Sequence, residues 1–348
     1  VLKTTPDKIR VHQHLLGGGY GRRIWPDAVA QAVVLSNITK ETVKLMLTRE
    51  DDLTAARPRP MTYHLLKAGL DGGGDLVAWH HRLAAENVDA VAAPPRFKAT
   101  GGKDIIGWRG LEEPFYSVPN ILADAVREQR GVRVHAWRGI GAGYNKFAAE
   151  SFLDEIAHAT KKDPLVLRLE LTKDHPRAHA VIREVAQMAQ WDRKRPAGRA
   201  LGIAFSDYHD SFSAGIAEVS LDRKTGKIRV HDYWIVGDAG IIVQPENAHA
   251  QLESAVVYGL SSALSEELTF KDGAVQQTNF HQYQLLRMSD VPLIHTKILV
   301  TDNAPSGLGE LGVPCVAPAI GNAVFKLTGK RLRQLPMSPA RVSAILKA

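Results

Sequence analysis

Three successive segments of alternating apolar and polar residues constrain the fold of this chain most strongly. They span residues 200–209, 214–222 and 228–237, and the turn sequence Asp-Arg-Lys-Thr-Gly-Lys joins the last two. A period of two is typical of strands with one buried face, and short glycine-containing turns join antiparallel neighbours. We therefore expect strands to dominate the chain from about residue 198, with a turn between the last two of these segments.

The chain before this point mixes strands and helices. Residues 62–85 hold two alternating runs around Asp-Gly-Gly-Gly, which predicts a β-hairpin. Proline and glycine mark residues 94–112 as a surface excursion. Further predicted elements are strands at 8–14, 43–48 and 132–137, a helix at 27–38, two helices within 146–174, and helices at 244–267 and after 312. The predicted class is α+β, with mixed sheets and packed helices. The chain divides into residues 1–197 and 198–348, with an approximate boundary between these two parts.

Composition excludes several classes of protein. Of the 348 residues 45% are hydrophobic and 23% charged, as in a soluble globular protein with a sizeable core. No apolar run is long enough for a membrane span, and the scattered basic residues behind the net charge of +7 lack a nucleic-acid motif. The start has neither an initiator Met nor a signal-peptide pattern, so we expect the continuation of something longer. The single cysteine, Cys315, cannot ligate an iron–sulfur cluster alone, which leaves any cluster to a partner.

A glycine-rich loop at residues 15–23 is the first candidate for a binding site. Gly18, Gly19 and Gly21 surround Tyr20, and the missing Cβ atoms let backbone N–H groups approach a ligand. The loop matches neither the phosphate-loop motif nor the dinucleotide motif. A sharp turn with glycines at positive φ explains the same residues, so both interpretations stay open.

Two polar side chains lie beside small residues. Arg138 follows the predicted strand 132–137 between glycines, where a guanidinium can bind an anionic oxygen or simply lie at a strand end on the surface. Gln251 lies on a stripe of small residues in the predicted helix 244–267. If buried, its amide must find a partner, which backbone groups would provide as well as a ligand.

Glu310 stands among small and apolar residues just before the last predicted helix. A poorly solvated carboxylate in that place would suit a general base. A carboxylate near a helix also caps backbone N–H groups, and local sequence does not separate the two roles.

Other catalytic patterns are absent from the sequence. None of the 14 histidines has zinc-site spacing, and no Gly-x-Ser-x-Gly elbow is present. A nicotinamide dehydrogenase built on Gly-Ile-Gly-Ala-Gly is disfavoured because no acidic residue follows at the expected place.

Seven ordered segments together resemble one family: the molybdopterin-binding large subunits of the xanthine dehydrogenase/aldehyde oxidase family. The similarity is closest to the branch of isoquinoline 1-oxidoreductase and membrane-associated aldehyde dehydrogenase. The segments that carry it are residues 15–23, 49–52, 116–120, 137–157, 244–264, 277–290 and 307–336.

The resemblance implies a molybdenum hydroxylase that oxidises an electron-poor carbon with oxygen from water. Its base is the Glu of the C-terminal Gly-x-Gly-Glu segment, here Glu310. The same resemblance assigns cofactor contacts to Gly18, Gly19, Tyr20, Gly21, Arg138, Gln251 and Gly309, with no metal ligand on this chain. The cofactor would be molybdopterin with molybdenum, in the cytosine dinucleotide form.

Two departures refine this expectation. Purine-oxidising members carry a Glu where this chain has Ile24, and their substrate-binding Arg has no counterpart before residue 120. Ile24 and Ile140 therefore predict an apolar pocket for an aldehyde or an N-heteroaromatic ring.

The second departure is length, because the resemblance covers only the C-terminal half of such subunits. The expected partners are the N-terminal half, a small subunit with two [2Fe-2S] clusters and, further, a cytochrome c, but no nucleic acid. The expected location is periplasmic or membrane-associated without a transmembrane segment, with the cytoplasm as alternative. A rival hypothesis is a cofactor-free half-subunit that serves assembly without turnover.

Overall fold

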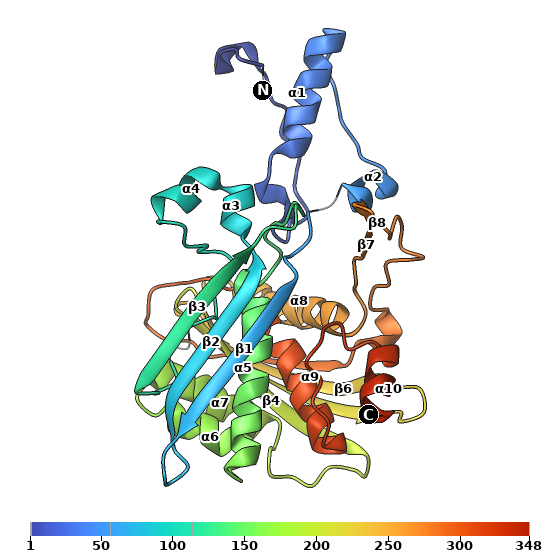
Figure 1. The fold of residues 1–348 in the computed structure, drawn as a ribbon. Helices are drawn as coiled ribbons and strands as arrows, with labels where there is room; N and C mark the ends of the chain where they lie inside the picture. The colour runs from blue at the N-terminus through green and yellow to red at the C-terminus, as the bar shows by residue number, and fades with distance from the viewer. Residues whose placement is uncertain (1, 56, 113–114, 348) are drawn as a thin grey trace.

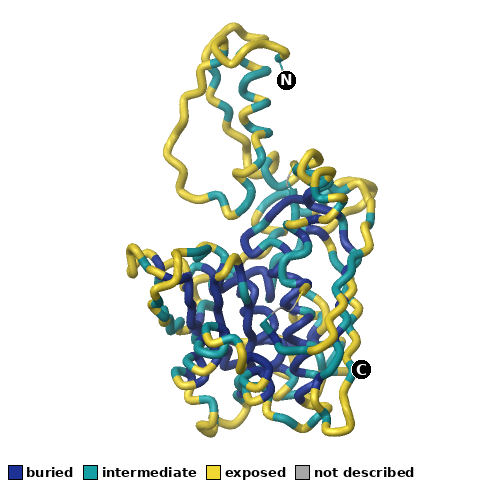
Figure 2. Tube along the Cα trace, turned by 90° about the vertical axis from the view of Figure 1, so that its left-hand side faces the viewer, coloured by how far each residue is buried: buried dark blue, intermediate teal, exposed yellow. Residues whose placement is uncertain are grey.

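The structure, a computed structural model, describes residues 2–55, 57–112 and 115–347. A body built from two larger sheets and their helices carries an arm, residues 2–48, that projects away from it (Figure 1). The arm holds two short 3-10 helices, η1 (Pro6–Lys8) and η2 (Arg22–Ile24), and helix α1 (Asp27–Thr39). Its surface is exposed or only partly buried throughout, in contrast to the body (Figure 2).

The main sheet has the strand order β4-β5-β6-β9. Its first three strands, whose positions the alternating pattern predicted, form an antiparallel meander, and β9 adds parallel to β6. Helices cover both faces, which explains why β5 is buried along most of its length. The strands are β4 (Arg199–Tyr208), β5 (Ser211–Leu221), β6 (Ile228–Asp238) and β9 (Leu293–Ile298).

A second sheet of three strands lies against helix α5 (Figure 1). Strands β1 (Thr62–Leu70) and β2 (Leu76–Glu86) form the predicted hairpin, and β3 (Asn120–Glu128) pairs parallel to β2. A small two-stranded ribbon pairs β7 (Phe270–Lys271) with β8 (Ala274–Val275).

The helices of the body match the predicted positions and add others. Helix α6 begins after Asp163, whose carboxylate accepts hydrogen bonds from Leu165 N–H and Val166 N–H, as expected of this cap. The helices beyond the arm are α2 (Arg49–Thr54), α3 (Val88–Ala92), α4 (Pro94–Ala99), α5 (Ile140–Ala159), α6 (Pro164–Leu171), α7 (Pro176–Met188), α8 (Pro245–Leu264), α9 (Val313–Thr328) and α10 (Pro339–Lys347), with the 3-10 helix η3 (Met288–Asp290).

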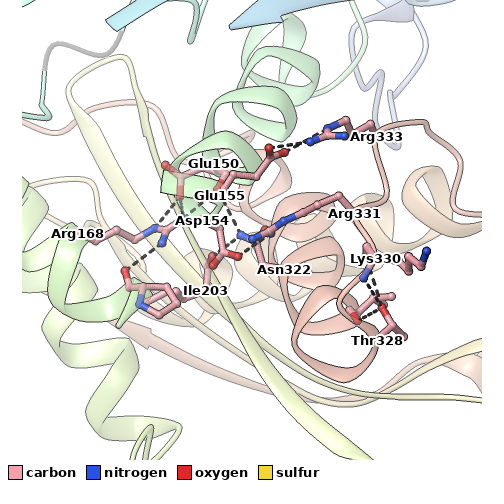
Figure 3. Close-up of polar contacts among 12 residues, drawn as sticks. Glu150, Asp154, Glu155, Arg168, Ile203, Asn322, Thr328, Lys330, Arg331 and Arg333 are labelled. Carbon is pink, nitrogen blue, oxygen red and sulfur yellow. Dashed lines mark hydrogen bonds and ion pairs between the residues drawn. The ribbon is translucent and has the colours of Figure 1, made fainter. Parts of the chain in front are cut away.

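A buried polar network joins α5 to α6, α9 and β4 (Figure 3). The Glu150 carboxylate accepts hydrogen bonds from Arg168 at 2.9 Å, Tyr116 O–H at 2.7 Å and Phe205 N–H at 2.9 Å. Glu150 and Arg168 are both fully buried. Burial acts to lower the pKa of Arg168, but Glu150, Tyr116 and Asp154 together outweigh it, and the pKa is raised. The oxygens of the Glu150 carboxylate are satisfied by three donors.

Three of the predicted strands are not formed within the described chain. Residues 8–14, 43–48 and 132–137 form no ladder. Alternation marks a segment able to form a strand, but a strand needs a neighbour to pair with. Strand β3 and helix α7 were not predicted.

The division near residue 198 stays a prediction. Hydrophobic residues from both sides of it share a core, since Leu153 and Val181 pack in one cluster with Phe205 and Ile216. Among the described residues, no helix is both long and apolar enough to cross a membrane, and no group of three or more His, Cys, Asp or Glu could hold a metal ion.

Candidate functional site

The site is organised around Arg138, which immediately precedes the N-terminal end of α5. Its side chain is almost fully buried, and each guanidinium nitrogen donates to a protein acceptor. Nε donates to Gly309 O at 2.5 Å, and one terminal nitrogen donates to the Ser254 hydroxyl at 2.8 Å. The other donates to Gln251, to Oε1 at 2.9 Å and to the backbone O at 3.1 Å. The structure thus brings Arg138, Gln251 and Gly309 together through hydrogen bonds with one another.

The glycine loop contacts this group through Tyr20. Its backbone O accepts from Arg138 N–H at 3.0 Å, and its ring stacks on Tyr258 with centroids 4.4 Å apart. The Arg138 guanidinium lies 5.8 Å from the Tyr20 ring centroid and 5.4 Å from that of Tyr258. These cation–π contacts add to the hydrogen bond and hold the loop against the segment that precedes α5.

The loop backbone explains its glycines. Gly21 has φ 101°, and a Cβ there would lie 2.5 Å from Ala136 O, so only glycine fits. Gly18 has φ 128° and Tyr20 has φ 49°, while Gly19 lies against the Arg23 side chain. Both interpretations of the loop therefore describe real features: it is a turn with positive φ, and it lies beside Arg138.

Glu310 is partly buried and reaches the N-terminal end of α5. Its Oε1 accepts from Gly139 N–H at 3.4 Å, where Gly139 is the N-cap residue of that helix. Glu310 therefore accepts a hydrogen bond at a helix N-terminus, as the capping interpretation expects. The helix is α5, however, and not the adjacent α9. Burial lowers the pKa of Arg138, and the nearby Glu310 carboxylate acts on that pKa in the opposite direction.

Tyr208, at the end of β4, is the site residue that sequence reasoning missed. It is only 4% exposed, and its hydroxyl lies close enough to the Glu310 carboxylate to interact with it. Burial raises the pKa of Tyr208, and Glu310 raises it further, so the hydroxyl stays a donor at neutral pH. The alternating pattern predicted the strand that carries Tyr208, but nothing local links the end of this strand to residue 310.

The two isoleucines predicted for the substrate pocket lie in different settings. Ile140 has φ 39°, an unusual value for a β-branched residue, and packs against the main core. Ile24 lies in η2 and is 73% exposed. Their role in one pocket stays a prediction.

A hollow of about 220 Å³ opens beside Gln251 at the start of α8. The polar residues that line it are Gln244, Asn247, Gln251 and Ser306, and the apolar ones are Ala239, Ile241, Ile242, Val243, Ala248 and Leu308. A mostly apolar hollow with a few amides and a hydroxyl is the usual composition of a small-molecule site.

Comparison with known proteins decides the family. Two family models, both described as molybdopterin cofactor-binding domains, match residues 1–170 and 133–292. The chain belongs to the molybdopterin-binding large subunits of the xanthine dehydrogenase family. It is 38% identical to the beta subunit of isoquinoline 1-oxidoreductase from Brevundimonas diminuta, over 98% of its own length and 44% of that protein.

Two further relatives are similar over nearly the whole chain. The membrane-bound aldehyde dehydrogenase (pyrroloquinoline-quinone) of Gluconacetobacter polyoxogenes is 32% identical over 98% of this chain and 47% of that protein. A subunit of nicotinate dehydrogenase from Pseudomonas putida is 30% identical over 97% of this chain and 30% of that protein. This large-subunit chain therefore spans less than half the length of these three relatives, two of which are named as subunits.

Solved structures show the same fold. Aldehyde oxidoreductase from Desulfovibrio gigas superposes with a TM-score of 0.82 at 16% identity, over 96% of this chain and 54% of that one. Quinoline 2-oxidoreductase from Pseudomonas putida 86 gives 0.81 at 14% identity, over 95% and 68%. The predicted α+β class of the molybdenum hydroxylases is confirmed.

The residues present fit one side of a molybdopterin. The Gln251 amide is exposed at the hollow while its Oε1 is held by Arg138, so the NH₂ group faces outward. Gly309 is exposed, and a Cβ there would meet no heavy atom within 4 Å, so space exists beside the Glu310 loop. The individual cofactor contacts of Gly18, Gly19, Tyr20, Gly21, Arg138, Gln251 and Gly309 stay predictions.

Proposed function

We propose that this chain forms the part of a molybdenum hydroxylase large subunit that carries the catalytic base. The observation that carries the proposal is the position of Glu310. Its carboxylate lies at the N-terminal end of α5, where it accepts from Gly139 N–H and lies beside the Tyr208 hydroxyl, in a loop anchored by Arg138. When bound, the molybdenum cofactor would supply the two-electron oxidation and the site at which water-derived oxygen is activated.

The chain's own residues would hold the base and move its proton. The Glu310 carboxylate would accept a proton as oxygen is transferred to the substrate carbon, which is general base catalysis. Arg138 fixes the backbone of this loop through Gly309 O, and Gln251 would offer its amide to the cofactor. Precise placement matters because a base contributes only within hydrogen-bond reach of the proton it removes.

The proposed substrate is an aldehyde or an N-heteroaromatic ring. Relatives named for isoquinoline, nicotinate and aldehyde oxidation support this range. Ile24 and Ile140 would contribute apolar surface, which selects a substrate by its shape rather than by its charge.

The proposed assembly contains more than this chain. It includes the remaining part of the large subunit, a small subunit with [2Fe-2S] clusters that accepts the electrons, and a cytochrome c as the next carrier. The proposed cofactor form is molybdopterin cytosine dinucleotide. We propose a periplasmic or membrane-associated location, with the cytoplasm as the alternative.

The test is metal content together with turnover. The complex, purified with its partners, should contain stoichiometric molybdenum and oxidise an aldehyde or N-heteroaromatic substrate with an artificial electron acceptor. A properly assembled complex without molybdenum and without turnover would instead support the assembly role. Turnover without molybdenum would contradict the proposal directly.

A further inference from the structure

The arm is exposed or partly buried along its whole length (Figure 2), and many of its exposed residues are large and apolar. Ile38 is 70% exposed and Met46 81% exposed. Scattered exposed apolar residues are ordinary, but a series on one projecting segment indicates an interaction surface. The other exposed apolar residues of the arm are Val11, Leu15, Leu16, Ile24, Val29, Leu35 and Leu47.

Helix α1 is apolar on all sides. Alanine, valine, leucine and isoleucine occupy residues 28–30, 32–35 and 38, which together cover every direction around a helix. Yet no residue of α1 is buried. A helix that is hydrophobic all round is normally buried. Packing partners on several sides of α1 are therefore missing from the described chain.

The segments on either side of α1 have the pattern of strands without the pairing. Ile9 and Val11 alternate with polar residues before the helix, and Val43, Leu45 and Leu47 alternate after it. Within the described chain, residues 10–16 and 42–47 make no backbone hydrogen bond, so their N–H and C=O groups are open. The order strand, helix, strand is that of a βαβ unit, whose two strands lie parallel in one sheet.

We propose that residues 8–48 are a βαβ unit whose sheet is completed by strands from the remaining part of the large subunit. This inference rests on the proposed half-subunit assembly. The family match at residues 1–170 includes the whole arm, which makes the arm part of the cofactor-binding domain. The relatives also contain more than half of their length beyond the region this chain matches. That polypeptide would pair with the open strands and cover α1, which explains both features with one partner.

The base of the arm is already arranged for docking. Arg22 donates two hydrogen bonds to the Asp27 carboxylate, at 3.0 and 2.7 Å, at the start of α1. Arg57 from the body lies 3.6 Å from the same carboxylate and over the Trp25 ring. The glycine loop lies between the first open segment and α1, so pairing of the arm would also fix the loop that carries Tyr20.

The experiment co-expresses this chain with the polypeptide of the same organism that corresponds to the unmatched part of the isoquinoline 1-oxidoreductase relative. Hydrogen exchange is compared in the free chain and in the complex, and the affinity is measured for two variants. Ile38→Asp places a charge on α1, while Val166→Asp makes the same change at an exposed position of α6. Because both side chains are exposed, neither variant should change the Tm of the free chain.

We expect exchange in residues 9–16 and 42–48 to slow by at least about tenfold in the complex. Ile38→Asp should weaken association by about tenfold or more, and Val166→Asp should leave it unchanged. A complex in which both segments exchange as fast as in the free chain, or in which both variants bind equally well, would overturn the βαβ inference and leave the proposed function standing. Failure of the two polypeptides to associate at all would overturn both the inference and the half-subunit assembly. A complex with protected segments but no molybdenum would contradict the proposed function alone.

Discussion

The proximity of the Tyr208 hydroxyl to Glu310 predicts the effect of Tyr208→Phe on the pH dependence of catalysis. The variant removes one hydroxyl and keeps the ring, which is 4% exposed and part of the main core. A hydroxyl that can donate to a carboxylate favours the ionised form of that carboxylate. Its loss should make Glu310 easier to protonate, so the acidic limb of the kcat profile should move to higher pH.

The size of the shift follows from the bonds that remain. A hydrogen bond to a charged group contributes about 1.5–3 kcal/mol, and one pH unit corresponds to about 1.4 kcal/mol. The recorded backbone donor to this carboxylate, Gly139 N–H, is long at 3.4 Å, so its own contribution is small. Glu310 is only partly buried, however, and water would replace part of the loss. We therefore expect a shift of about one pH unit, with kcat little changed above the limb.

The assay is the kcat profile between pH 4 and 9 of the molybdenum-loaded complex, with Tyr233→Phe as matched control. Tyr233 is fully buried, and its hydroxyl has no hydrogen-bond partner among the described residues, so its removal should leave the profile unchanged. An acidic limb that stays in place in Tyr208→Phe, or moves to lower pH, would refute the reasoning.

Two further variants test the framework of the site. Arg138→Lys keeps the charge but cannot bond Gly309 O and Gln251 at once, so the molybdenum content and kcat should both fall. Metal analysis and turnover measurements test this expectation. A variant with full molybdenum content and full activity would contradict it. Arg168→Met leaves the buried Glu150 carboxylate without its cation and should lower the free energy of unfolding by about 3–5 kcal/mol. Urea denaturation measures that loss, and adding Glu150→Gln should recover part of it; a stability loss below about 1 kcal/mol would contradict the role of the pair.

The sequence predicted those elements whose partners lie close along the chain. The hairpin of β1 and β2 and the strands β4, β5 and β6 followed from alternation and turn residues, and these elements are confirmed. The predicted strands at 8–14 and 43–48 have the same alternation but no partner strand among the described residues of this chain. Periodicity reports which face of a segment is apolar, and it does not report what covers that face.

The candidate site shows the same limit. No local pattern separated base from cap at Glu310, and the family resemblance selected the residues that converge on Arg138. The sequence could not predict Tyr208 as a site residue, because its contact with Glu310 depends on where β4 ends and on how the loop before α9 is held. Such contacts arise from tertiary packing between distant segments.

The most direct test of the central claim is the turnover of Glu310→Gln in the molybdenum-loaded complex. The substitution keeps the side-chain shape and removes the basic oxygen, and Glu253→Gln on the exposed face of α8 serves as control. We predict molybdenum content equal to the unmodified complex and a kcat lower by a factor of about 10² to 10⁴, with the control unaffected. Full turnover in a molybdenum-loaded Glu310→Gln complex would contradict the assignment of Glu310 as the base.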